Sequence, residues 1–440
     1  MRRRCSCRDL PRLRVVGLAV KMRGSYFRGP MLTRVFLFFA ASTAVLRSAD
    51  WPQWRGPGLD GRSTETGFPT EWSATKNVTW KSELPGGGHA SVIVSGDNLF
   101  TVAANPDTQE RLLVCLNRGS GKIRWQQAVI KSPMERKHSE NSHASGTPAC
   151  DGERVYCTFL DGAGVVAAAY DLAGNQLWLK RPGKFSSVHG FCSTPVLFKD
   201  KVIVNCDHDG DGYIVALART DGRELWRIDR PNKTRSYVAP LIREAAGRMQ
   251  MVLSGSKCVT SYDPETGRLL WIVDGPTEQF VASPVFSEKT GLFYITGGFP
   301  DHHVIAIRPD GTGNVTKTHI VWHHHAAKGV SYVPSPVIEG DWLLLNDDIG
   351  FAHAFDAKTG DIVWTERFGR THASQVSTGG LVYFLNDKGT CRVVRPAEKF
   401  TVVATNEIGE GMYASPALSE GQIFLRGDRT VYCIGRRQPR

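Results

Sequence analysis

A tryptophan recurs along the chain at intervals of 42 to 53 residues. Most of these tryptophans end a segment in which a glycine-containing turn separates two short apolar runs, as in FDAKTGDIVW (355–364) and YDPETGRLLW (262–271). The seven positions are Trp80, Trp125, Trp178, Trp226, Trp271, Trp322 and Trp364. A period of about 40–50 residues is found in the blades of β-propellers and in some helical repeats, so the local pattern must decide between the two.

Short strands fill each repeat. Runs rich in Val, Ile and Tyr flank Asp-Gly, Thr-Gly or Ala-Gly, a pattern that predicts hairpins. A second pair of short runs precedes each hairpin, as in SPVIEGDWLLLN (335–346). The apolar residues alternate or cluster over four to six positions, which is too short for helices. One repeat is therefore predicted to be a four-stranded blade.

The chain contains eight such repeats. Aligned by eye, their innermost strands begin at His89, His143, His189, Tyr237, Phe280, Tyr332, His372 and Tyr413. The last repeat has only three strands before the chain ends, and the orphan strand NVTW (77–80) supplies the fourth. The sequence therefore predicts an all-β fold: an eight-bladed β-propeller of four-stranded antiparallel blades, closed by an N-terminal strand that completes the C-terminal blade.

The tryptophans have a structural role in this prediction. A large flat side chain late in each blade fills the space that widens toward the rim, and burying it contributes roughly 4–6 kcal/mol before opposing terms. The glycine supplies the positive φ that the turn requires. The repeat that begins at His372 has no such Trp, and Val402 and Val403 are expected to take its place.

The repeat also carries a family pattern. AFDAKTGDIVW (354–364) fits the tryptophan-docking pattern A-x-D-x-x-T-G-x-x-x-W, and SYDPETGRLLW (261–271) departs from it only at the first position. On these residues the chain resembles the PQQ-like β-propeller repeat family from about Trp80 to Gly435. That family includes quinoprotein alcohol dehydrogenases and the propeller lipoprotein of the outer-membrane barrel-assembly machinery. The resemblance implies the fold and leaves the function open, because one fold hosts many sites.

Two classes of function follow from the resemblance. The chain has no adjacent Cys-Cys, the ring-forming disulfide of many quinoprotein dehydrogenases, and no assignable counterpart of their calcium ligands or catalytic Asp. We therefore expect a non-catalytic binding or scaffold module, with no catalytic residues, for a protein, glycan or small ligand at the channel face. The alternative is a PQQ-dependent oxidoreductase with PQQ and calcium in the central funnel. No cofactor is firmly implied, and the residues leave any metal unknown.

Residues 1–49 have the character of a leader. Arg34 precedes an apolar run (35–46) and then small residues, which is typical of a secretory signal. The first 30 residues hold nine Arg or Lys and one Asp, so we interpret Met31 as the true start, the alternative being a long basic n-region. The predicted layout is a leader (1–49), an N-terminal arm (50–76), the propeller (77–435) and a tail (436–440). We expect an exported, periplasmic or extracellular monomer that is not integral to the membrane once the leader is removed.

The net charge gives no support to nucleic-acid binding. The formal charge is +11, but residues 1–49 contain 11 basic residues and one acidic residue, which leaves 43 basic and 42 acidic residues in the rest. A nearly neutral chain lacks the basic surface that nucleic-acid binding needs. The arm segment WPQWRGPGLDG (51–61) is expected to pack outside the ring and cover apolar surface, the alternative being a binding role.

Cysteines and histidines suggest further sites only weakly. Four cysteines fall on predicted third strands, where a small buried side chain suffices: Cys115, Cys258, Cys391 and Cys433. Two pairs flank hairpin turns and could form cross-strand disulfides: Cys150 with Cys157, and Cys192 with Cys206. His323, His324 and His325 are consecutive, and neighbouring strand residues point to opposite faces, so all three cannot bind one metal without a bend.

One constellation remains as a candidate ligand site. If the eight strand starts are equivalent, His89, His143, His189 and His372 form a ring at the channel mouth with Tyr237, Tyr332, Tyr413 and Phe280. Charged residues just before these strands would surround the ring: Arg235, Lys328, Arg370, Glu140 and Glu410. We expect such a ring to hold a small anionic or aromatic ligand, and the alternative is a polar lining with no ligand.

Overall fold

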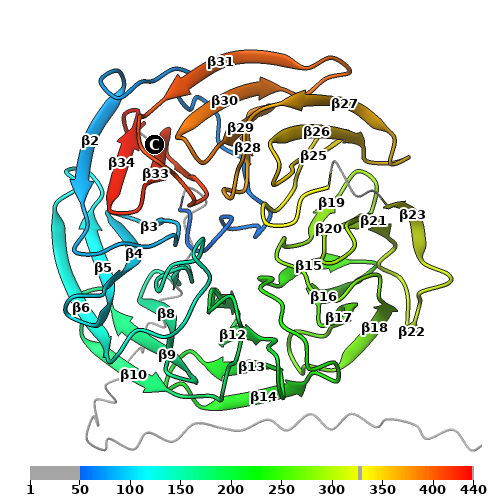
Figure 1. Cartoon of the computed structure of the whole chain (residues 1–440), viewed down its shortest axis with the longest axis horizontal. Coiled ribbons are helices and arrows are strands. Elements are labelled where there is room, and N and C mark those ends of the chain that lie inside the picture. Colours follow the sequence, from blue (N-terminus) through cyan, green and yellow to red (C-terminus); the bar gives the residue numbers. More distant parts are fainter. Residues whose placement is uncertain (1–49, 326–329, 439–440) are drawn as a thin grey trace, which may run out of the picture. The chain divides into compact units, whose positions relative to one another are not determined.

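The computed structural model describes residues 50–325 and 330–438, whose strands form eight β-sheets arranged in a ring (Figure 1). Each sheet contains four antiparallel strands, which we call A to D from the channel outward, and two of the sheets also have a short parallel fifth strand. We number the blades 1 to 8, starting from β3. The predicted all-β, eight-bladed propeller is therefore confirmed. No helix within the described ranges is long and apolar enough to cross a bilayer. The predicted leader (1–49) lies outside the described residues.

The strands of blades 1 to 4 are, in order, β3 (Ile93–Ser95), β4 (Asn98–Asn105), β5 (Glu110–Asn117) and β6 (Ile123–Lys131); β7 (Ala149–Cys150), β8 (Arg154–Asp161), β9 (Gly164–Asp171) and β10 (Gln176–Lys180); β11 (Val196–Phe198), β12 (Lys201–Cys206), β13 (Tyr213–Ala218) and β14 (Glu224–Asp229); β15 (Leu241–Ala245), β16 (Arg248–Gly255), β17 (Cys258–Tyr262) and β18 (Leu269–Asp274). Those of blades 5 to 8 are β19 (Val285–Ser287), β20 (Leu292–Gly297), β21 (His303–Ile307) and β23 (Ile320–His325); β24 (Val337–Glu339), β25 (Trp342–Asn346), β26 (Phe351–Asp356) and β27 (Ile362–Arg367); β28 (Val376–Thr378), β29 (Leu381–Leu385), β30 (Thr390–Arg395) and β31 (Thr401–Glu407); β32 (Ala417–Ser419), β33 (Gln422–Arg426), β34 (Thr430–Ile434) and β2 (Val78–Glu83).

The ring closes as the sequence predicts. Strand β2 pairs antiparallel with β34, with Trp80 opposite Cys433. The last blade thus takes strands A to C from the C-terminal end of the chain and strand D from its N-terminal part. This pairing satisfies the outer edge of β34, which would otherwise present unpaired backbone groups.

The docking tryptophans join neighbouring blades through a directed hydrogen bond. In five cases the indole N–H donates to a carbonyl in the C–D turn of the next blade, at 2.8 to 3.2 Å. These pairs are Trp80 with Arg118, Trp125 with Leu172, Trp178 with Arg219, Trp322 with Ala357, and Trp364 with Ala397. Because the indole N–H finds a partner only in the next blade, each bond fixes two blades against each other.

The turn glycine serves this contact in two ways. Gly121 and Gly360 have φ values of +71° and +83°, as the predicted turn requires. Their bare Cα atoms also pack against the preceding blade's indole. A Cβ at Gly121 would lie 2.5 Å from Trp80, and one at Gly360 would lie 2.7 Å from Trp322. Any side chain here would therefore push the tryptophan out of place.

Blade 5 departs from this scheme because its C–D turn is longer. The turn passes over the outer edge of blade 4, where β22 (Gly313–Asn314) pairs in parallel with β18 and Gly313 lies opposite Trp271. The indole of Trp271 donates instead to Oε1 of Gln250 in its own blade, at 2.8 Å. The long turn thus adds a fifth strand to blade 4 in place of the usual contact.

Blade 7 lacks a docking tryptophan of its own, and the N-terminal arm supplies one. Val402 and Val403 are 41% and 42% exposed, so the prediction that they fill this place is wrong. Ala404 occupies the tryptophan's register on β31. Trp72 of the arm is 4% exposed and stacks on Tyr383 of β29, with ring centroids 6.3 Å apart.

The cysteines are buried or half-buried and unpaired. All eight that the structure describes are free thiols, so neither suggested disulfide forms. Cys115, Cys258, Cys391 and Cys433 are buried on strand C, as predicted. Cys115 and Cys433 lie directly opposite docking tryptophans, where a small side chain leaves room for the indole.

We predict that Trp72→Ala lowers the free energy of unfolding by about 3–5 kcal/mol, the range for removing a large buried side chain. Val403→Ala is the matched control in the same blade, and an exposed substitution should change stability by less than about 0.5 kcal/mol. Guanidinium unfolding of both variants and the parent protein measures the difference. Equal stability of the two variants would show that Trp72 does not act as the missing docking residue.

Candidate functional site

Hydrogen bonds between neighbouring A strands form a belt around the channel. In six places a backbone N–H donates to the side-chain hydroxyl of the equivalent residue in the next blade, at 2.9 to 3.2 Å. We call the eight equivalent positions the hydroxyl belt: Ser91, Thr147, Thr194, Ala239, Ser283, Ser335, Ser374 and Ser415. The one residue without a hydroxyl, Ala239, leaves blade 3 without this acceptor. A hydroxyl that accepts an amide proton retains its own proton for donation.

The residue two positions before each belt residue lines the channel cavity. These eight lining residues are His89, Ser145, Cys192, Tyr237, Val281, Val333, His372 and Tyr413, and with Trp54 and most of the belt they surround about 120 Å³. Four of them belong to the predicted ring. The polar aromatic residues of blades 7, 8 and 1 are contiguous, whereas blades 5 and 6 contribute two valines. The cavity therefore has a polar side and an apolar side.

The other four residues of the predicted ring lie elsewhere. Nε2 of His143 contacts the carbonyl of Glu135 at 2.9 Å, and Phe280 is fully buried in a core cluster between blades. The predicted alignment followed the aromatic residues, but the segments before the belt differ in length. His143 lies four residues before its belt position and His189 five, whereas His89 lies two before.

His189 and Tyr332 lie beside the cavity and support residues around it. Nδ1 of His189 lies 3.0 Å from the hydroxyl of the lining residue Tyr237. The Tyr332 ring stacks on His302, and its hydroxyl pairs with the side-chain amide of Gln279.

The charged residues expected around the ring are largely neutralised by ion pairs. Arg235 contacts both carboxylate oxygens of Asp209, at 2.8 and 2.9 Å, and Arg370 lies 2.5 Å from Glu140. Lys328 lies outside the described residues. Since the residues that line the cavity include no Asp, Glu, Lys or Arg, the pocket is uncharged apart from its imidazoles.

Three neighbouring rings form the polar side of the pocket: His89 stacks on Tyr413, and His372 meets Tyr413 edge to face. The Tyr413 ring lies between His89 and His372, with centroid distances of 4.6 Å to each. Asp387 accepts a hydrogen bond from the backbone N–H of His372 at 2.8 Å and contacts its Nδ1 at 2.9 Å. This double contact fixes the imidazole, whose Nε2 lies 3.8 Å from Oε2 of Glu140.

Burial, together with a neighbouring cation, keeps His89 neutral. Arg426 on β33 is 1% exposed, and its guanidinium donates to the carbonyl of Ala90 at 2.8 Å. Burial, and then the positive charge of Arg426, lower the pKa of His89 to about 4. A neutral imidazole offers one donor and one acceptor at neutral pH.

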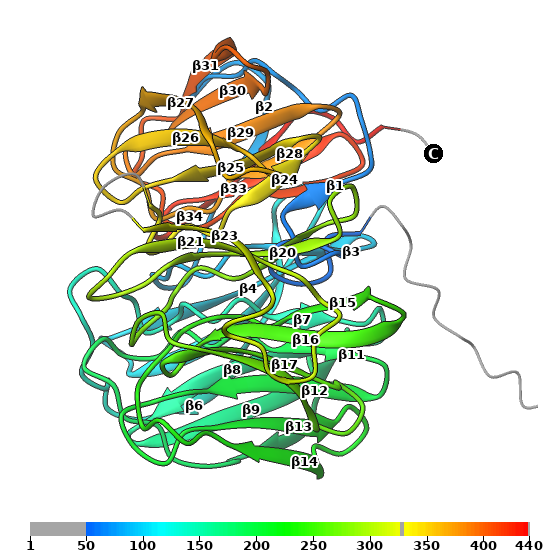
Figure 2. The same ribbon diagram turned by 90° about the vertical axis from the view of Figure 1, so that its right-hand side faces the viewer.

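The N-terminal arm closes one end of the channel, where the A–B turns lie. Residues 50–65, drawn in blue, cross the centre of the ring in Figure 1, and Figure 2 shows β1 (Arg62–Ser63) beside β28. Backbone bonds join Trp51 to Val94 and Pro52 to Cys150, and the Arg55 guanidinium donates to the Ser335 carbonyl. The Trp54 ring lines the cavity above them. The arm therefore lies across the channel and not outside the ring as predicted, and it makes the cavity a blind pocket.

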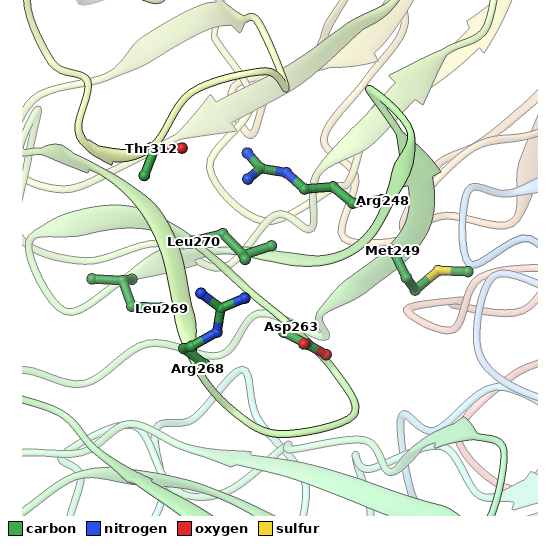
Figure 3. A pocket seen from close by; sticks show the side chains of 7 residues that line it. All are labelled: Arg248, Met249, Asp263, Arg268, Leu269, Leu270 and Thr312. Carbon is green, nitrogen blue, oxygen red and sulfur yellow. The ribbon is translucent and has the colours of Figure 1, made fainter. Parts of the chain in front are cut away.

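A second cavity of about 260 Å³ lies away from the axis, beside blade 4 (Figure 3). It is lined by Arg248, Met249, Asp263, Arg268, Leu269, Leu270 and Thr312. Arg248 donates to the carbonyls of Pro309 and Gly311, so its guanidinium already holds the long turn of blade 5. The cavity arises where that turn crosses blade 4, and we place the candidate site in the channel.

The channel does not fit PQQ with calcium. Among residues 50–325 and 330–438, no three His, Cys, Asp or Glu side chains are already arranged to hold a metal ion, and no carboxylate lines the cavity. Its volume of about 120 Å³ is also below the ~300–1,000 Å³ usual for a drug-sized ligand. The pocket suits a smaller, uncharged group.

The comparisons with known proteins agree with the fold. Residues 72–228 and 210–438 match the family described as outer membrane protein assembly factor BamB. BamB from Moraxella catarrhalis has 14% identity and a TM-score of 0.59, over 82% of this chain and 99% of its own. The quinohemoprotein alcohol dehydrogenase from Comamonas testosteroni has 13% identity and a TM-score of 0.62, over 91% and 82%. A europium-containing methanol dehydrogenase has 13% identity and a TM-score of 0.54, over 86% and 90%.

These structural likenesses, at 13–14% identity, show the fold alone. A comparison with curated proteins gives no significant match. The family match covers most of the chain, and the docking tryptophans and turn glycines explain why its repeat is recognisable. The chain belongs to the PQQ-like, BamB-type family of β-propellers.

Proposed function

We propose that this protein is an exported binding module whose blind channel pocket holds one saccharide unit of a glycan. The observation that carries the proposal is the chemistry of the lining: hydroxyls, imidazoles, phenols and the Trp54 indole, with no Asp, Glu, Lys or Arg. A sugar presents many hydroxyl groups and an apolar ring face. Neutral donors and acceptors beside aromatic rings match both features.

The polar groups are held in place before a ligand arrives. Asp387 orients His372, and the stack of His89 on Tyr413 restricts both rings. A ligand bound between them loses little free energy to ordering side chains, because the belt and the stack have already ordered them. This preorganisation favours recognition of a small polar group.

The pairing of the outer arginines favours a neutral ligand over an anionic one. Glu140 and Asp209 neutralise Arg370 and Arg235, and a carboxylate or phosphate would have to compete with them. A neutral sugar does not need the arginines and so does not compete with these carboxylates. The apolar side formed by Val281 and Val333 also suits the C–H face of a sugar ring better than an anion.

Export is the second part of the proposal. The matching family is described by an outer membrane assembly factor, and residues 31–49 have the Arg, apolar run and small residues of a secretory signal. Binding a glycan outside the cytoplasm agrees with that location.

The pocket is tested with a glycan array followed by calorimetric titration of the saccharides that bind. We expect His372→Gln to weaken binding at least tenfold while leaving the melting temperature nearly unchanged, because the backbone N–H of residue 372 still donates to Asp387. His143→Gln is the matched control, since His143 does not line the cavity. A parent protein that binds no saccharide, or an unaffected His372→Gln variant, would refute the proposal. Binding of PQQ with calcium in its place would favour the oxidoreductase alternative.

The export proposal is tested with a reporter enzyme that is active only outside the cytoplasm. Fusions that start at Met31 and at Met1 should give equal reporter activity, because residues 31–49 carry the signal pattern. Activity from the Met1 fusion alone would show that the basic segment is required. Activity from neither fusion would contradict export.

The lowered pKa of His89 predicts a stability change with pH. Its folded value of about 4 lies below the unfolded value near 6.5, so only the unfolded chain binds a proton between these pH values. Stability is therefore complete above pH ~6.5 and falls as the pH drops toward 4. His89→Phe keeps the stack on Tyr413 and should reduce the loss between pH 7 and pH 5 by about 1–2 kcal/mol. Urea unfolding at both pH values measures this, and parallel losses in parent and variant would contradict it.

A further inference from the structure

Three imidazoles gather on the outer part of blade 5, far along the blade from the channel pocket. His303 begins β21, and His323 and His325 end the edge strand β23. The two strands pair antiparallel, with His303 directly opposite His325 and Ile305 opposite His323. Directly opposed residues and residues two apart share one face of a sheet. The three imidazoles therefore lie on the same face, and His324 lies on the other.

Two of the imidazoles already direct nitrogens at each other. Nδ1 of His303 lies 2.8 Å from Nε2 of His323, and the ring of His325 stacks on His303 with centroids 4.8 Å apart. His303 is 5% exposed, while His323 and His325 are exposed. The cluster thus has one fixed, buried member and two members that solvent reaches.

The surroundings of His303 and His323 disfavour protonation of these two rings. Burial, and then the neighbouring imidazoles, lower the pKa of His303 to about 4, and the same causes lower the pKa of His323. Neutral imidazole is the form that binds metals, because the ring then has a free lone pair. The proton that His303 Nδ1 and His323 Nε2 share would move to the other nitrogen of its own ring when a metal binds.

We propose that His303, His323 and His325 bind a divalent first-row transition metal of the zinc class. Three imidazoles and a water complete the tetrahedral shell that Zn²⁺ prefers. The shell is not ready-made, because the His325 ring lies within 10° of parallel to His303 and its lone pairs do not converge on the same point. His325 is exposed at the end of an edge strand, so its ring is free to turn toward the His303–His323 pair.

Such a metal would link β23, the outer strand of blade 5, to its neighbour β21. Strand β23 follows the long turn that forms β22 on blade 4, so the usual short C–D turn does not restrain it. A metal that binds only the folded blade stabilises it in proportion to the logarithm of the metal concentration. The proposal is independent of the channel pocket.

Zinc titration of the mature protein tests the site. The protein is purified without a polyhistidine tag, treated with EDTA, dialysed, and titrated with Zn²⁺ alone by calorimetry. We expect one bound Zn²⁺ per chain and at least a tenfold loss of affinity in His323→Gln and in His325→Gln. His324→Gln is the matched control, because this neighbouring imidazole lies on the opposite face against Phe355. The His324→Gln variant should bind Zn²⁺ with the affinity of the parent protein.

Thermal melting shows whether a variant has lost only its Zn²⁺ site or has lost its folded structure. Both site residues are exposed, so the metal-free variants should melt with the parent, and Zn²⁺ should raise the melting temperature of the parent and His324→Gln only. The proposal is overturned if the parent binds no Zn²⁺, if His324→Gln loses as much affinity as the other two, or if the His323→Gln/His325→Gln double variant keeps the parent's affinity.

Discussion

The contact of a tryptophan in one blade with a glycine turn in the next is the interaction on which this propeller depends. The indole N–H gives each contact a direction, and the missing Cβ of the glycine lets the ring lie flat against the turn. Where the contact cannot form, the chain replaces it with a different one. The long turn of blade 5 adds β22 to blade 4, and Trp72 of the arm packs on blade 7. Each replacement buries the same part of the blade, because a gap there would cost packing energy.

At the inner end of the blades, the hydroxyl belt has the corresponding role. Its hydrogen bonds hold the A strands in one register, so the residue two positions earlier faces the channel in every blade. The chemistry of the pocket therefore depends on eight side chains and on the Trp54 ring that the arm places between them. Because the arm bonds to several blades and crosses the channel, it both braces the ring and closes the pocket.

No Asp, Glu, Lys or Arg lines the pocket, because the charges around it are paired or buried behind it. Arg370 and Arg235 contact carboxylates, while burial and the nearby charge of Arg426 lower the pKa of His89. This arrangement leaves hydroxyls and neutral rings to meet a ligand, which is the basis of the saccharide proposal. The outer face of blade 5 is different, since three imidazoles gather there, of which solvent reaches His323 and His325. The same repeated blade thus carries both proposed sites, the saccharide pocket and the metal site, because function depends on the side chains placed on the fold.

The sequence by itself determined the repeat, the number of blades and the strand that closes the ring. These features depend on local patterns, namely the spacing of tryptophans, the glycine turns and the orphan NVTW strand, and local patterns persist wherever the chain folds the same way. The tertiary structure decided which residues share a site. Unequal loops shifted His143 and His189 away from the lining, and the arm reached the channel through contacts with blades distant in sequence. His303 likewise met His323 and His325 only through strand pairing. Such contacts depend on packing and register between separate segments, which no periodicity along the chain encodes.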